Sequence, residues 1–81
     1  MNAQKLLARI TAHPDVMVGK PTIRGLRITV EQILKALANN RTPQQIMEDY
    51  PELEQEDIQA VLLHVTELVG EEQVFNINTA R

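Results

Sequence analysis

Residues 29–51 read TVEQILKALANNRTPQQIMEDYP, and this stretch decides the fold. In its first half the apolar side chains recur at i, i+3, i+4, i+7 and i+8, which is the spacing of one face of an α-helix. Thr29 suits the N-cap position, and Gln32 completes the pattern of a capping box three residues later. We therefore predict a helix that begins after Thr29 and ends at Asn39.

A second helix start follows in the same stretch. Thr42 suits the N-cap position, Pro43 suits the first helical position, where its missing N–H costs nothing, and Gln45 completes a second capping box. Pro51 cannot continue a helix, so the second predicted helix is short.

Apolar residues repeat at helical spacing once more, and they predict a third helix over residues 55–69. Glu56 and Asp57 fall in its first turn, where the helix dipole favours acids, and Gly70 suits the position just past its end. Across the three helices, six side chains are predicted to form the core: Ile33, Leu37, Ile46, Val61, Leu62 and Val65.

The sequence before Thr29 has a different texture. Between residues 9 and 28, β-branched residues alternate with the breakers His13-Pro14-Asp15, Gly19-Lys20-Pro21 and Gly25, which predicts two or three short strands in a hairpin. The β-branched residues are Ile10, Val16, Val18, Ile23 and Ile28, and residues 1–8 form a frayed or helical lead-in. A two-stranded ribbon is marginal in water, so it should pack on the helices or pair with another chain.

These elements predict one mainly α domain over residues 1–81. A β-hairpin (9–28) precedes a three-helix bundle (29–70), and residues 71–81 form a C-terminal tail. The short second helix and the three-residue link to the third match a helix-turn-helix layout. We expect a homodimer, because a chain of 81 residues buries only about 60–65% of its unfolded surface when it folds alone.

Composition excludes several classes of protein. The chain has no Cys, which excludes disulfide scaffolds, zinc fingers and iron–sulfur proteins, and it has no Ser to act as a nucleophile. We expect no enzyme activity, no cofactor and no metal; a small metal-dependent hydrolase is the weak alternative, since carboxylate runs are usually solvated helix ends. No apolar run is long enough to span a bilayer and no secretion signal is visible, so we expect a cytoplasmic protein without membrane contact.

Charge is divided unevenly along the chain. Residues 1–41 carry a net charge of +5 and residues 42–81 a net charge of −8. The bases concentrate on the predicted ribbon, whereas the third helix has no Lys or Arg and should present Glu54, Glu56 and Asp57 towards any DNA phosphate. Gln55 and Gln59 could read adenine edges from an outward face that also includes Ala60. The candidate DNA-binding residues are Lys20, Arg24, Arg27, Gln55 and Gln59.

Two stretches resemble a known family. GKPTIRGLRI (residues 19–28) and TPQQIMEDYPEL (residues 42–53), the latter followed by Glu56-Asp57-Ile58, are similar to a bacterial and archaeal family called domain of unknown function 433. The resemblance covers roughly residues 9–69, with departures at Leu26 and Glu54. The positions it implies as conserved are Gly19, Lys20, Pro21, Ile23, Arg24, Gly25, Arg27, Ile28, Tyr50 and Pro51.

The resemblance implies a homeodomain-like, usually dimeric domain that is antitoxin-like and stands beside a PIN-like ribonuclease. Under that hypothesis the protein binds the ribonuclease toxin, and its own operator DNA is a second expected partner. The tail offers Val74, Phe75 and Ile77 as partner-binding candidates, because apolar and aromatic anchors dominate such contacts; the alternative is that Phe75 folds back onto the helical core or pairs across the dimer. The alternative is a dimeric interaction module that does not bind DNA, which the acidic third helix favours.

Overall fold

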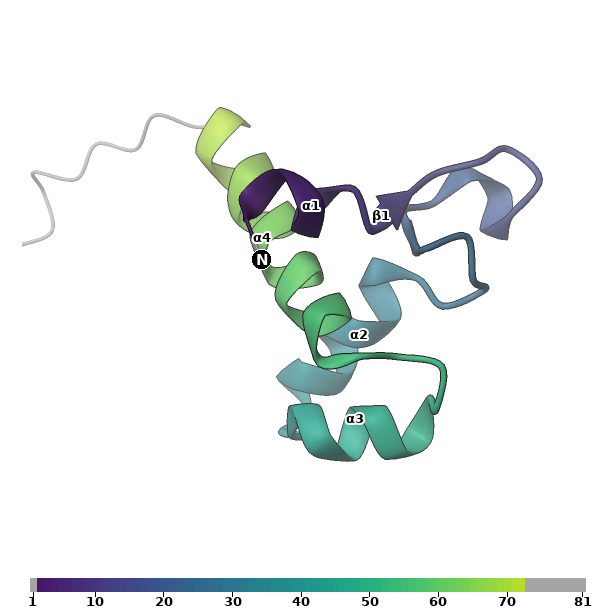
Figure 1. Ribbon diagram of the computed structural model, residues 1–81, viewed down its shortest axis with the longest axis vertical. Coiled ribbons are helices and arrows are strands. Elements are labelled where there is room, and N and C mark those ends of the chain that lie inside the picture. Colours follow the sequence, from purple (N-terminus) through teal and green to yellow (C-terminus); the bar gives the residue numbers. More distant parts are fainter. Residues whose placement is uncertain (1, 73–81) are drawn as a thin grey trace, which may run out of the picture.

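The helices begin where the capping signals predict. The computed structural model describes residues 2–72, in which α2 spans Val30–Ala38, α3 spans Pro43–Asp49 and α4 spans Gln55–Glu72. A short helix, α1 (Ala3–Leu7), and two strands, β1 (Ile10–Thr11) and β2 (Thr22–Ile23), precede them (Figure 1). The mainly helical class and the N-terminal hairpin are therefore confirmed.

Both predicted capping boxes form. At the start of α2 the Thr29 hydroxyl accepts from the Gln32 amide at 3.0 Å, and the Gln32 side chain accepts from the Thr29 amide at 2.8 Å. Thr42 and Gln45 repeat the arrangement at the start of α3, at 3.1 and 2.9 Å. Each box satisfies amide groups that a helix start leaves without partners.

The hairpin is shorter than predicted. Its strands pair antiparallel with Ile10 opposite Ile23, and a single further bridge joins Thr22 to Thr29 within the described residues. Of the two or three short strands predicted, two form, and residues Met17–Gly19 between them form a 3₁₀ turn. Met17 and Val18 have φ values of 51° and 57°, in the left-handed region that no strand can contain.

The end of α4 also differs from the prediction. Gly70 is predicted to lie just past the helix end, but α4 continues through it to Glu72. Gly70 has no positive φ, so it does not make the left-handed turn that ends a helix, and the following Glu71 and Glu72 are good helix formers. The predicted tail thus begins inside α4, and residues 73–81 lie outside the described residues.

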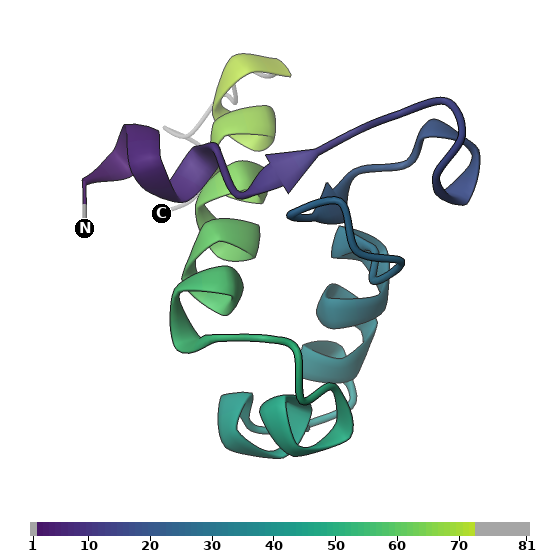
Figure 2. The same cartoon turned by 45° about the vertical axis from the view of Figure 1, so that its right-hand side comes forward.

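The two views show how these elements lie together. The hairpin and α1 lie beside α4 at one end of the molecule, while α3 runs across the bottom, where α2 ends and α4 begins (Figures 1 and 2). No helix within residues 2–72 is both long and apolar enough to cross a lipid bilayer.

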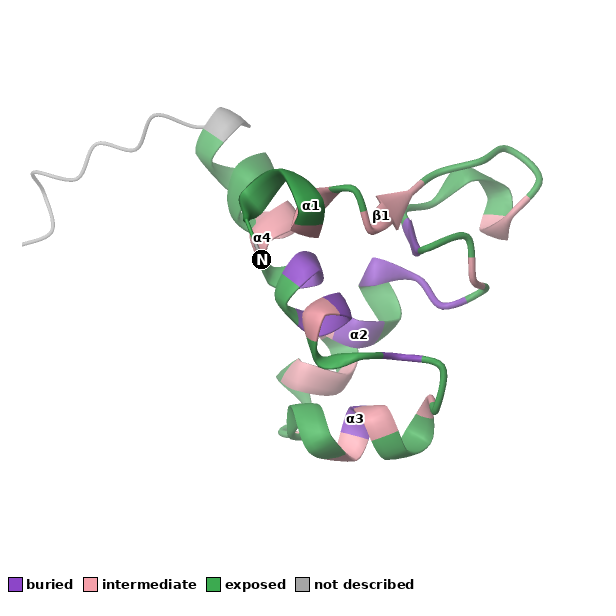
Figure 3. Ribbon diagram, viewed as in Figure 1, coloured by how far each residue is buried: buried purple, intermediate pink, exposed green. Residues whose placement is uncertain are grey.

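The core lies between α2, α3, the hairpin and the first half of α4 (Figure 3). Of the six predicted core residues, Ile33, Ile46 and Val61 are fully buried, and Leu37 and Val65 pack half-buried at the edge. Six apolar positions outside the predicted set are also buried: Ile23, Ile28, Val30, Leu53, Ile58 and Ala60.

Leu62 does not belong to the core, because 49% of its surface is exposed. The buried face of α4 passes through Ile58 and Val61, and Leu62 stands one residue further round the helix. Ala60 is the opposite case: it is predicted to face outward and is fully buried. The stripe that meets the core is thus rotated from the predicted one towards Ala60.

Candidate functional site

A carboxylate is buried at the start of α4. Asp57 is 0% exposed, although the sequence places it in the first turn of a helix, where acids normally face water. Its Oδ2 accepts from the backbone amide of Glu54 at 2.8 Å, so the side chain reaches back over the start of its own helix. This is the reciprocal half of a capping box, with Asp where Glu or Gln is usual.

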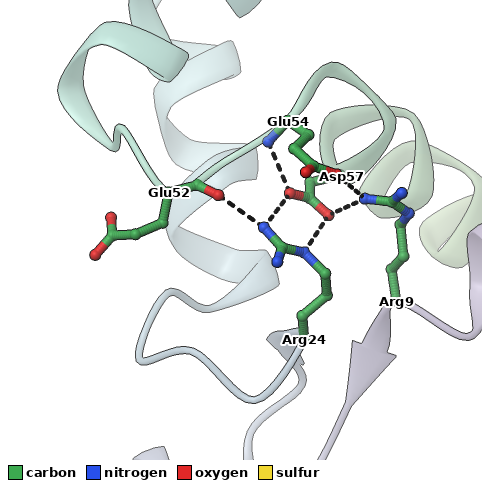
Figure 4. A network of polar contacts seen from close by, with 5 residues as sticks. All are labelled: Arg9, Arg24, Glu52, Glu54 and Asp57. Carbon is green, nitrogen blue, oxygen red and sulfur yellow. Dashed lines mark hydrogen bonds and ion pairs between the residues drawn. The ribbon is translucent and has the colours of Figure 1, made fainter.

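Two arginines from the hairpin region meet this carboxylate (Figure 4). The Arg24 guanidinium makes a bidentate contact with the Asp57 carboxylate: Nε donates to Oδ1 at 3.0 Å and Nη2 donates to Oδ2 at 2.9 Å. Arg9 donates to Oδ1 at 2.9 Å and to the carboxylate of Glu54 at 2.8 Å. We call Arg9, Arg24, Glu54 and Asp57 the Asp57 cluster. Arg9 precedes β1 and Arg24 follows β2, and the Arg24 amide donates to the Arg9 carbonyl at 2.7 Å, so both arginines lie at the base of the hairpin. The cluster therefore fastens the base of the hairpin to α4.

The cluster is held in its charged form. Burial raises the pKa of Asp57, but hydrogen bonds from Arg24, the Glu54 amide and Arg9 outweigh burial and bring the pKa below its ordinary value. Hydrogen bonding to these acids raises the pKa of both arginines, with Glu54 the largest influence on Arg9 and Asp57 the largest on Arg24. The Asp57 carboxylate accepts four hydrogen bonds, so its oxygens are occupied by donors within the protein. Such a carboxylate is suited to a structural role and poorly suited to proton transfer.

A tight turn aims Arg24 at the cluster. Arg24 and Gly25 both have left-handed backbones, with φ values of 47° and 73°, and the Leu26 amide donates to the Ile23 carbonyl at 2.7 Å. The Arg24 guanidinium also donates to the Glu52 carbonyl at 2.7 Å, in the link that leads into α4. A left-handed arginine is an uncommon and costly conformation, and here the two-ended contact with Asp57 compensates for it.

The other two predicted ribbon cations lie elsewhere. Lys20 and Arg27 line a groove of about 480 Å³ at the tip of the hairpin, together with Pro14, Asp15, Met17 and Val18. We call this the hairpin-tip groove. Lys20 forms an exposed ion pair with Glu31 at 3.0 Å, and Val18 is 92% exposed at the turn. The structure therefore groups Lys20 with Arg27 and separates Arg24 from them.

The predicted reading face on α4 is only partly as expected. Gln55 and Gln59 are exposed on successive turns, as their positions predict. Asp57, which is predicted to face phosphates beside them, is instead buried against the two arginines. Residues 2–72 contain no group of three or more His, Asp or Glu side chains arranged to hold a metal ion. The partner-binding candidates Val74, Phe75 and Ile77 lie outside the described residues.

Sequence reasoning missed the Asp57 cluster. Arg24 and Asp57 are 33 residues apart, and no local pattern joins them. One signal was present: Asp57 lies three residues after Glu54, the capping-box spacing, and four residues before the buried Val61, on the same side of the helix.

Comparison with known proteins places the chain in a family. Residues 10–64 match the family model described as "Protein of unknown function (DUF433)". Among curated proteins, the uncharacterized protein y4eO of Sinorhizobium fredii (strain NBRC 101917 / NGR234) is 28% identical over 68 residues, which is 82% of this chain and 31% of that protein. The chain thus spans about a third of the length of this relative. No solved structure matches. Because the family model covers well over half of the sequence, including both hairpin strands and the start of α4, the chain belongs to the DUF433 family.

Proposed function

We propose that this protein is an antitoxin-like interaction module that binds a PIN-like ribonuclease. In this proposal α3 and α4 form a helix-turn-helix arrangement within a homodimer. The supporting observation is the character of α4, which has acidic and exposed apolar side chains and no Lys or Arg.

The chemistry of the proposed partner fits this helix. An enzyme that cleaves RNA needs a basic groove for the phosphates, and an inhibitor that fills the groove needs acidic groups with apolar anchors. The arginines of the Asp57 cluster neutralise Asp57, but Glu56 and Glu67 have no ion-pair partner among the described residues. Leu62, Leu68 and Val69 are each about half exposed on the same helix. In the proposed complex Val74, Phe75 and Ile77 extend this acidic and apolar surface.

Co-purification with a neighbouring PIN-like ribonuclease tests the proposal. We expect Glu67→Lys to weaken the complex and to release the toxicity of the ribonuclease in cells, because it reverses a charge on the proposed contact surface. The matched control is Glu48→Lys, which reverses the charge of another exposed acid, on α3, and should leave binding unchanged. Failure of the unaltered protein to bind and neutralise the ribonuclease would overturn the proposal.

Operator DNA is a second candidate partner. The hairpin-tip groove supports it, since Lys20 and Arg27 lie together there beside the exposed Val18. Phosphate contacts by such cations supply most non-specific affinity for DNA, and Gln55 and Gln59 are exposed as candidates for contacts with bases. A gel-shift assay with the upstream DNA separates this candidate from the alternative, a dimeric interaction module that does not bind DNA.

A further inference from the structure

An apolar groove lies along the second half of α4. It has a volume of about 380 Å³, and its apolar lining includes Val30 and Leu34 from α2 and Val65, Leu68 and Val69 from α4, with Pro21 and the carboxylate-bearing Glu31 also lining it. We call it the α2–α4 groove. Figure 2 shows that α4 extends beyond α2, and in this part of the helix Leu68 and Val69 remain about half exposed.

The same groove contains an unsatisfied polar atom. His64 lines it, and its Nε2 atom is buried without a hydrogen-bond partner in the described part of the chain. Buried side-chain nitrogens nearly always have a partner, so an isolated one indicates that a group is missing from its surroundings. An extended segment could supply this group, because its backbone exposes both N–H and C=O.

Charge argues against a second copy of α4 as the occupant. Each α4 carries five acids and no Lys or Arg, so two of these helices side by side would repel one another. Residues 73–81, with the sequence QVFNINTAR, are better matched. They contain no acid, and they carry apolar side chains at Val74, Phe75 and Ile77.

We propose that residues 73–81 dock into the α2–α4 groove of their own chain. The distance is short: from Val65 to the end of α4 at Glu72 is about 10 Å along the helix, whereas nine extended residues reach about 30 Å. In an extended segment Phe75 and Ile77 point to the same side, so both can enter the groove together. The direct link to α4 gives an effective concentration of the order of millimolar, which favours docking within the chain.

This inference does not depend on the proposed function, but it bears on it. Phe75 and Ile77 would be used twice, once in the groove and once against the ribonuclease. A partner that captures the tail must then displace it from the groove, which makes the docked tail an autoinhibitory contact.

A single fluorescent reporter tests the docking. The chain contains no Trp, so Phe75→Trp creates one probe in the tail of the otherwise complete protein. We expect blue-shifted emission and protection from acrylamide. Adding Leu68→Asp places a charge in the apolar groove, so the ratio of docked to free tail should fall by at least about tenfold and the emission should shift to the red.

Leu62→Asp is the matched control. Leu62 is the same residue type on the same helix and is 49% exposed, against 44% for Leu68, but it does not line the groove. Because the tail docks in its own chain, Leu62→Asp should leave the emission unchanged even where it alters the assembly of the chain, and circular dichroism should show that both variants keep their helices. Equal quenching of the introduced tryptophan in all three backgrounds would overturn the proposal.

Paired cysteines decide which chain provides the tail. Because the protein has no Cys, every disulfide in oxidised Leu34→Cys/Ile77→Cys involves only the introduced cysteines. We expect a cross-linked monomer on a non-reducing gel and none from Leu62→Cys/Ile77→Cys. The single variants Leu34→Cys and Ile77→Cys show which dimers arise when like cysteines pair between chains. A cross-linked dimer that neither single variant forms, without a cross-linked monomer, would mean that the tail reaches a second copy, and absence of any cross-linked monomer or such dimer would mean that the tail does not enter the groove; either result contradicts the proposal. Since the isolated chain is used throughout, failure to bind a ribonuclease has no effect on these outcomes.

Discussion

Asp57 shows how a single acid joins segments that are far apart in the sequence. Its side chain accepts a hydrogen bond from the Glu54 amide at the start of α4. It also accepts hydrogen bonds from Arg9 and Arg24, which flank the two strands at the base of the hairpin. Desolvation makes a buried ion pair only a modest source of stability, yet the loss of one partner is costly because the remaining charges lose their compensation. Asp57 is therefore more important for keeping the hairpin on α4 than for total stability.

Asp57→Asn should destabilise the fold by about 2–3 kcal/mol. This is below the usual range of about 3–5 kcal/mol for breaking a buried pair, because both arginines can turn towards water. Urea unfolding measures the loss. The control Glu54→Gln removes a 57% exposed acid from the same cluster and should cost less than about 1 kcal/mol. Equal losses for the two variants would show that burial of Asp57 is not what matters.

The same residue predicts a dependence of stability on pH. The pKa of Asp57 in the folded chain lies below its ordinary value of 3.8, so the folded state favours the ionised carboxylate. Its contribution is complete above that ordinary value and is lost as the pH falls through the folded pKa. Unfolding free energies measured between neutral and acidic pH should therefore drop below about pH 4, and the drop should be smaller in Asp57→Asn. If the unfolding free energy fell equally at acidic pH in both proteins, Asp57 would not be the source of this pH dependence.

The residues of the cluster also mark a limit of prediction from sequence. The exposure of Gln55 and Gln59 follows from helix periodicity, which is local. The contact between Arg24 and Asp57 depends on how a left-handed turn and a helix start meet in space, and neither residue signals the other along the chain. For that reason the sequence alone predicts Arg24 to be available for DNA binding together with Lys20 and Arg27, whereas in the structure Arg24 is paired with Asp57.

Among the elements, the starts of helices are predicted well and their ends poorly. Thr29 and Thr42 define the starts of α2 and α3 through contacts that span three residues, so the sequence contains the whole signal. The end of α4 has no comparable signal, since Gly70 suits either a helix end or a weak helical position. The 3₁₀ turn at Met17–Gly19 escapes prediction because β-branched residues there favour strand, while the chain connecting β1 to β2 requires left-handed residues.

Gly70→Ala should stabilise the protein. Gly70 is helical, and a Cβ atom added there would meet no atom within 4 Å, so Ala gains helix propensity without a clash. We expect a gain of about 0.5–1 kcal/mol in unfolding free energy and a small increase in helical circular dichroism. If Gly70 instead formed a left-handed helix end, Ala would be destabilising, and a loss of stability would show that α4 ends at Val69.

At the scale of the whole molecule, the exposed apolar surface of α4 bears on assembly. Leu68 and Val69 line the α2–α4 groove, where the proposed docking of the tail would cover them. Leu62 lies outside the groove and is about half exposed. The proposed homodimer would cover Leu62 with a surface of the second copy other than its acidic α4, because a small fold gains much of its stability from any further apolar burial. Chain length predicts a homodimer, but the element pattern does not predict which surface it uses, because neighbouring apolar residues of one predicted stripe lie in the core at Val61 and on the open surface at Leu62.

Leu62→Asp should therefore convert a dimer into a monomer. A charge at the proposed interface would lose its hydration on association, which is costly without a partner. Light scattering at micromolar concentration gives the mass directly, and Glu67→Gln on the same helix serves as a control that should leave the dimer intact. A monomer mass for the unaltered protein would end the homodimer proposal, and a dimer mass for Leu62→Asp would place the interface on another surface.

The distribution of cations over the molecule sets the expected salt dependence of any DNA binding. Lys20 and Arg27 face the hairpin-tip groove, whereas Arg24 is held by Asp57, so a dimer offers four phosphate contacts. At roughly −0.9 per contact, the slope of log K against log salt should be about −4. The ion pair between Lys20 and Glu31 is exposed, so Lys20 should exchange Glu31 for a phosphate at little cost.

Arg27→Ala should flatten this slope and weaken binding to all DNA sequences alike, while Arg24→Ala should lower the stability of the fold and leave the slope unchanged. A flatter slope in Arg24→Ala would mean that DNA draws this arginine away from Asp57, and the hairpin would then have to loosen from α4 whenever DNA binds.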